Sequence, residues 1–229
     1  MTTNHHPNGL RPEGDLGAFA ASLPTTSFDE LYHVGTMDPT DKGRAAGSLE
    51  GDGLSVSMHP EEWERIARLG GNPTWVLTKE PNRFVRYHAL GDGHHDALAA
   101  WAVERGYAQR ATLWHVTWED DDEGGPVSFV VDSEAAAAEE AELRDDDSVT
   151  IHTETGLVAT PALTQRLGQH CHLGLVEDLA WVAFVGELAD TVDLDGIWWD
   201  DRYDPAALSC PRGVIVPARV ATFTAVRVD

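Results

Sequence analysis

Polar residues that could do chemistry lie in three short apolar stretches of the chain. His33 lies in LYHVGT, Ser55 and Ser57 lie in GDGLSVS, and Asp200 and Asp201 end DGIWWDD. A carboxylate beside a breaking glycosidic bond stabilises the oxocarbenium-like charge of the transition state and can hold a neighbouring hydroxyl group. The two aspartates are therefore candidates for catalysis at a ribose. The histidine and the serines are candidates for ligand binding through hydrogen bonds.

Aromatic and cationic side chains lie near the two aspartates. Trp198 and Trp199 adjoin them in the sequence and offer flat walls for a charged aromatic ring. Arg212 is one of the few cations in this part of the chain, and a guanidinium binds a pyrophosphate well. The alternative is structural: the tryptophans belong to the core, the aspartates are a solvated strand end, and the arginine holds a loop.

Strand alternation separates the two aspartates. Ile197 has no polar function and is expected in the core, which leaves Asp200 on the opposite face with Trp198. Gly196 on that same face would let a ligand approach the backbone closely. We therefore predict that Asp200 is the principal catalytic acid and that Asp201 contributes less.

Possible zinc ligands occur together in His170, Cys171 and His172. Adjacent ligands rarely converge on one metal ion, and the chain has no C-x-x-C pair. We therefore expect no metal site. Cys171 and Cys210 are expected to be buried thiols rather than nucleophiles.

The net charge is the strongest compositional signal. The 229 residues carry a formal charge of -23, with 16 Lys and Arg against 39 Asp and Glu. Such a surface repels nucleic-acid backbones, so broad nucleic-acid binding is not expected. The acidity is typical of a solubility-adapted or salt-adapted surface, and an acidic binding site is the alternative.

Targeting signals are not evident in the sequence. Two cysteines do not make a disulfide framework, and no charged segment followed by an apolar run precedes residue 28. No stretch of about eighteen apolar residues suggests a membrane span. The sequence therefore predicts a soluble, cytoplasmic protein that does not bind membranes.

Hydrophobic periodicity predicts many strands and few helices. Strands are expected over 28–34, 54–58, 72–77, 84–89, 111–118, 127–131, 149–152, 181–188, 196–200 and 221–228, and helices from Pro60 and over 96–105, 133–144 and 161–167. Without regular alternation of strands and helices, this pattern indicates an α+β fold. Residues 1–27 are expected to form a flexible tail, which leaves 28–229 as a single domain.

The first two stretches resemble the signatures of a known family. LYHVGT, GDGLSVS and the PEEWERIA that follows are similar to the first two motifs of the ADP-ribosyltransferase fold, as found in poly-ADP-ribose polymerases and RNA 2'-phosphotransferases. DGIWWDD is the only stretch that fits the third motif, an acidic residue on a late strand. The resemblance covers three short pieces of the chain. It implies a split antiparallel β-sheet with short helices.

The same resemblance assigns roles to individual residues. His33 would hydrogen-bond the adenosine ribose of NAD, and the backbone at Val34 and Gly35 would grip the nicotinamide amide. A serine stands at 55 where the polymerases carry a stacking tyrosine, so the serines would orient the ligand through hydrogen bonds. The residues expected to bind NAD are His33, Gly35, Thr36, Ser55, Ser57, Trp198 and Arg212, and the expected catalytic acids are Asp200 and Asp201.

Two classes of function follow from this resemblance. The first is an NAD-dependent ADP-ribosyltransferase, or an NAD glycohydrolase, that cleaves the nicotinamide–ribose bond with NAD as its substrate, in the role of an intracellular effector or toxin. Its ADP-ribose acceptor is not specified by the sequence. The second is a catalytically inactive module on the same fold that binds a nucleotide or a protein partner.

Overall fold

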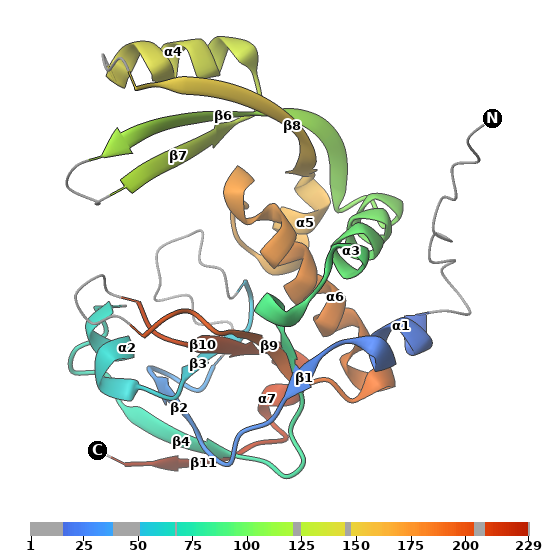
Figure 1. Ribbon diagram of the computed structural model, residues 1–229. Helices are drawn as coiled ribbons and strands as arrows, with labels where there is room; N and C mark the ends of the chain where they lie inside the picture. Colours follow the sequence, from blue (N-terminus) through green and yellow to red (C-terminus); the bar gives the residue numbers. More distant parts are fainter. Residues whose placement is uncertain are drawn as a thin grey trace.

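The structure is a computed structural model that describes residues 16–38, 51–66, 68–120, 125–144, 148–203 and 209–228 (Figure 1). The helices are α1 (Leu16–Ser22), α2 (Pro60–Ile66), α3 (Asp92–Glu104), α4 (Glu134–Arg144), α5 (Pro161–Leu167), α6 (Val176–Val192) and α7 (Pro217–Val220), with 3-10 turns η1 (Tyr87–Ala89) and η2 (Leu173–Leu175). The strands are β1 (Thr25–Thr26), β2 (Leu31–Val34), β3 (Leu54–Ser57), β4 (Thr74–Thr78), β5 (Phe84–Arg86), β6 (Ala108–Asp120), β7 (Gly125–Val131), β8 (Thr150–Ala159), β9 (Gly196–Trp199), β10 (Arg212–Ile215) and β11 (Thr224–Arg227). This mixture of elements confirms the predicted α+β class.

An eight-stranded sheet forms the larger body of the protein, in the order β1-β5-β9-β10-β3-β2-β4-β11. Neighbouring strands are antiparallel except β5 and β9, which are parallel. The ladder between β2 and β3 has one register pair, Tyr32 with Ser57, whereas β10 and β3 share four. The sheet is therefore weakly joined near its middle. It curls around side chains contributed by both halves.

Apolar side chains cover both faces of this sheet, and β9 shows this most clearly. Ile197 and Trp199 belong to the cluster lined by α6, whereas Trp198 belongs to a second cluster with Phe84 and Leu77 inside the curl. Neighbours along an extended strand point to opposite faces. The predicted register of β9 is thus confirmed.

The segment 181–188, predicted as a strand, lies within helix α6, so that prediction was wrong. The helix has 17 residues and buries ten of them. A helix that is apolar all round has no amphipathic period, so periodicity does not distinguish it from a buried strand. Gly186, which weakened the helix interpretation, lies beside Arg166, whose Nη2 would be 3.0 Å from an added Cβ.

Residues 87–195 connect β5 to β9 and are named here the crossover segment. Parallel neighbours need such a connection because the chain must return to the same end of the sheet. The segment contains a three-stranded antiparallel sheet, β7-β6-β8, with α4 packed on one face through Val116, Trp118 and Ala137. Figure 1 shows α3, α5 and α6 between the two sheets.

Two segments differ from the sequence prediction in other ways. Residues 16–27, expected in the flexible tail, form α1 and β1, with Ala20 and Leu23 buried, while 1–15 lie outside the described residues. β10 was missed because it is a four-residue strand directly after Ser209, Cys210 and Pro211, which the sequence pattern indicated as part of a loop.

Within the described ranges, none of the helices is both long enough and apolar enough to cross a membrane.

Candidate functional site

The C-terminal end of β9 carries Asp200, which is oriented by two partners. Its Oδ2 lies 2.5 Å from Arg86 Nε, and its Oδ1 accepts a hydrogen bond of 3.1 Å from the Trp198 indole N–H. The aspartate side chain is 33% exposed and that of the arginine 52%. An ion pair this exposed contributes little to stability. Asp200 is therefore both oriented and reachable from solvent.

Asp201 follows directly and joins two strands. Its Oδ2 lies 3.1 Å from Arg212 Nη1, and its Oδ1 lies 4.0 Å from His88 Nε2. Arg212 begins β10 and is in register with Trp199 on one side and Ser57 on the other. Only about a fifth of each partner's side chain is exposed, 20% for the arginine and 22% for the aspartate. Asp201 is thus less accessible than its neighbour.

His33 is buried on β2, and backbone oxygens lie beside both of its ring nitrogens. Nδ1 is 2.8 Å from the carbonyl oxygen of Ser55 on β3, and Nε2 is 2.8 Å from that of Thr36. A carbonyl oxygen only accepts hydrogen bonds, so an imidazole that keeps both contacts carries a proton on each nitrogen. The side chain links β2 to β3 where the sheet is weakly joined.

Gly35 adopts a backbone conformation that suits only glycine. Its φ is +134°, and an added Cβ would lie 3.2 Å from His33 Nε2. Its N–H donates to the Pro73 carbonyl at 2.8 Å, and its carbonyl accepts from the Trp75 indole at 2.9 Å. The glycine backbone groups that the resemblance assigns to a nicotinamide amide are therefore bonded within the protein.

Ser55 and Ser57 are both fully buried on β3. The Ser57 hydroxyl donates to the Pro211 carbonyl at 2.8 Å and accepts from the His59 N–H at 3.0 Å. Its oxygen also lies 3.8 Å from Cys210 Sγ. This hydroxyl fastens the end of β3 to the start of β10.

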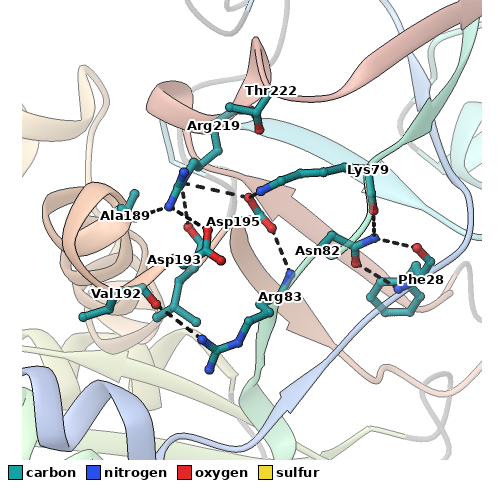
Figure 2. Close-up of polar contacts among 11 residues, drawn as sticks. Phe28, Lys79, Asn82, Arg83, Ala189, Val192, Asp193, Asp195, Arg219 and Thr222 are labelled. Carbon is teal, nitrogen blue, oxygen red and sulfur yellow. Dashed lines mark hydrogen bonds and ion pairs between the residues drawn. The ribbon is translucent and has the colours of Figure 1, made fainter.

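Trp198 is a core residue rather than an open wall for a ligand. It is 2% exposed, and the Phe28 ring lies 4.3 Å from it between centroids. Figure 2 shows how Asn82 holds the Phe28 backbone, which donates to the amide oxygen at 2.9 Å and accepts from the amide nitrogen at 2.6 Å. A cavity of about 610 Å³ opens beside Phe28 and is lined in part by Tyr32 and Met58.

Gly196 does not leave room for a ligand, so that expectation was wrong. An added Cβ would lie 1.7 Å from the backbone carbonyl oxygen of Val214 on β10. The close approach for which glycine is needed is that of the neighbouring strand.

The predicted residues share one sheet but form two groups. Asp200, Asp201, Trp198, Arg212 and Ser57 lie together at one end of β9, β10 and β3, whereas His33, Gly35, Thr36 and Ser55 lie around the junction of β2 and β3. From β9 to β2 there are three strand spacings, or about 14 Å. A single ligand would have to extend across the sheet to reach both groups.

Arg86 and His88 were missed by the sequence analysis. Arg86 ends β5, which pairs with β9 so that Arg86 is opposite Trp198, and His88 lies in the turn η1 that follows. The available signal was two basic residues at the end of a predicted strand. The pairing of that strand with one more than a hundred residues later could not be inferred from local pattern.

Both cysteines are free and buried, as predicted. Burial raises the pKa of the Cys171 thiol and of the Cys210 thiol, which makes them poorer nucleophiles. The His170 and His172 rings lie 5.0 Å apart, edge to face. Among the residues that the structure describes, no group of three or more His, Cys, Asp or Glu is arranged to hold a metal ion.

Comparisons with known proteins give no match: no protein family, no curated protein and no solved structure matches this chain.

Proposed function

We propose that the protein takes NAD as its substrate and cleaves the bond between nicotinamide and ribose. The observation that carries this proposal is the short ladder between β2 and β3, with one register pair, which the His33 contact with the Ser55 carbonyl bridges. The resemblance implies a split antiparallel sheet with its first two motifs on adjacent strands. In this chain the short ladder lies between the two strands that carry those motifs, which supports the proposal.

Asp200 is the group best suited to the chemistry. As the C1'–N bond breaks, its electron pair leaves with neutral nicotinamide and positive charge builds up on the ribose, where a carboxylate stabilises it. Water, or a nucleophilic group of an acceptor, then forms the new bond to C1' and releases a proton. The Trp198 indole holds the carboxylate in one orientation, and exposure leaves it accessible.

A second candidate function is a non-catalytic nucleotide-binding or protein-binding module. Ion pairs hold Asp200 to Arg86 and Asp201 to Arg212, and the Gly35 backbone is bonded to its own neighbours. These contacts favour a site whose polar groups stabilise the fold and do not take part in catalysis. The two functions differ in one measurable product, nicotinamide.

Nicotinamide release from NAD, followed by liquid chromatography, tests the proposal. We expect Asp200→Asn to lower the rate at least about a hundredfold, the scale for loss of one positioned electrostatic group, and Asp201→Asn to lower it less than about tenfold. Asp190→Asn, on the exposed side of α6, is a matched control and should retain the wild-type rate. No nicotinamide from wild type, together with calorimetric NAD binding, would instead support the binding module.

A further inference from the structure

A second cavity lies in the crossover segment, beside the three-stranded sheet. It measures about 400 Å³ and is lined by residues of α3, the three strands, η2 and the start of α6. Ligand pockets start at about 300 Å³, so this one suits a compound smaller than a typical drug. None of the residues assigned to NAD lines it.

Two histidine–glutamate pairs line this cavity. His95 Nδ1 contacts Glu177, and His115 Nε2 lies 2.9 Å from Glu154 Oε1. An ionised carboxylate only accepts, so the nitrogen facing it carries the proton. The remaining ring nitrogens, His95 Nε2 and His115 Nδ1, have no hydrogen-bond partner among the described residues. Each offers a lone pair to a ligand N–H or O–H group.

Arg110 brings the complementary chemistry to the same cavity. It is exposed, and within the described part of the chain it forms no ion pair, whereas Arg86, Arg105, Arg144, Arg166, Arg212 and Arg219 each form one. A guanidinium binds a carboxylate through two parallel hydrogen bonds. Arg110 therefore suits the anionic end of a ligand.

The charges around the cavity favour a ligand that also carries a cation. Asp96, Glu154 and Glu177 supply three carboxylates against one guanidinium, so with neutral histidines the lining carries an excess of negative charge. A simple anion would be repelled by this excess, within a chain of net charge -23. Leu113 and Leu157 provide an apolar wall for a short aliphatic chain.

We propose that this cavity binds a small zwitterion of the α-amino-acid class, with its carboxylate on Arg110 and its ammonium group among the glutamates and imidazoles. The same chemistry is offered by a free amino acid and by a short peptide. The site is independent of NAD cleavage, because it uses none of the residues at the end of β9.

Calorimetric titration of the full chain with leucine, leucinamide, N-acetyl-leucine and the dipeptide Leu-Gly tests this proposal. Leucine should bind, and the amide and the acetyl derivative, which each lack one charge, should bind at least about tenfold more weakly. Tighter binding of the dipeptide than of leucine would assign the site to peptides. Absence of binding by all four probes, or equal binding of leucine and leucinamide, would overturn the proposal.

Two variants locate the binding. Arg110→Gln and Glu154→Gln alter exposed side chains and should weaken leucine binding by about tenfold to a hundredfold each. Glu142→Gln removes an exposed carboxylate from α4, outside the cavity, and should leave binding unchanged. Wild-type affinity in Arg110→Gln, with thermal unfolding unchanged, would remove the arginine from the site and overturn the assignment.

Discussion

The two sheets of this protein use polar side chains in opposite ways. In the eight-stranded sheet all four residues of β3 are buried; the Ser55 carbonyl lies beside His33 of β2, and the Ser57 hydroxyl donates to Pro211 just before β10. In the three-stranded sheet the first six residues of β8 are exposed, and His115 and Glu154 face a cavity. Polar groups within covered strands hold this fold together, whereas polar groups on an open sheet face are available to ligands.

The difference follows from how each sheet is covered. Apolar clusters pack on both faces of the larger sheet, so a serine or histidine there must find a partner inside the protein. The smaller sheet has α4 on one face, and its other face is partly solvated. A polar residue in a uniformly apolar strand is thus a weak guide to ligand binding.

Glycine substitutions should give the largest difference in stability loss between the two sheets. In Gly196→Ala the new Cβ would lie 1.7 Å from the Val214 backbone oxygen, which cannot move without breaking the β9–β10 ladder. In Gly156→Ala the clash is with the tip of the Leu113 side chain at 2.3 Å, which can change rotamer. We expect losses of about 3 kcal/mol or more for the first and about 1 kcal/mol for the second, measured by urea unfolding.

Equal losses in the two glycine variants would contradict this contrast. They would mean that the smaller sheet is packed as rigidly against its leucine as the larger sheet is against its own backbone.

Removing one carboxylate from each sheet should give the next largest difference. Asp195, 1% exposed at the start of β9, contacts Lys79 Nζ and accepts from the Arg83 backbone N–H at 2.8 Å, with Arg219 Nε at 4.0 Å (Figure 2). Asp195→Asn leaves these largely buried cations without their counter-charge and should cost about 3 kcal/mol. Glu154→Gln breaks an exposed pair and should cost less than about 1 kcal/mol.

Chemical unfolding of both variants measures this second contrast. A loss below 1 kcal/mol for Asp195→Asn would show that water or a rearranged side chain replaces the carboxylate, and that burial does not govern the cost at this position.

Local sequence pattern was sufficient for elements whose chemistry is local. The helix from Pro60 appears as α2, because proline at its first position and two glutamates in its first turn favour a helix start. The alternation of Ile197, Trp198 and Trp199 followed from strand geometry alone. Segments decided by tertiary packing were not predictable: α6 buries ten of its 17 residues, in an unbroken run from Leu179 to Val185, so its period is hidden.

The candidate site was predictable only in part for a related reason. The common face of Trp198 and Asp200 follows from alternation within one strand. The cations that hold the aspartates come from β5 and β10, and their approach depends on strand pairing across long separations. The burial of Ser57 likewise depends on Pro211 and Cys210, which no local pattern connects to it.

The smallest expected effect concerns Asp178, which joins the crossover segment to the eight-stranded sheet. This α6 residue accepts a hydrogen bond of 2.9 Å from the Trp199 indole of β9. Burial raises the pKa of its carboxyl above the ordinary value of 3.8, the Trp199 hydrogen bond opposes this, and the charge of Glu177 adds to the increase. A raised pKa means that the folded state favours the protonated acid. The stabilising contribution of the protonated Asp178 carboxyl is therefore complete below pH 3.8 and is lost as pH rises through the folded pKa.

Asp178→Asn should remove this loss of stability at higher pH, because an amide oxygen still accepts from the Trp199 indole and never ionises. The free energy of unfolding of the variant, relative to wild type, should therefore increase as pH rises from below 3.8 toward neutrality. Urea unfolding across this range measures it, with Asp190→Asn as a control for loss of one negative charge from the exposed side of the same helix. A relative stability that instead falls with rising pH would mean that the ionised carboxylate is favoured by the Trp199 hydrogen bond more than it is penalised by burial. The contact between Asp178 of α6 and Trp199 of β9 would then involve an ionised carboxylate at neutral pH.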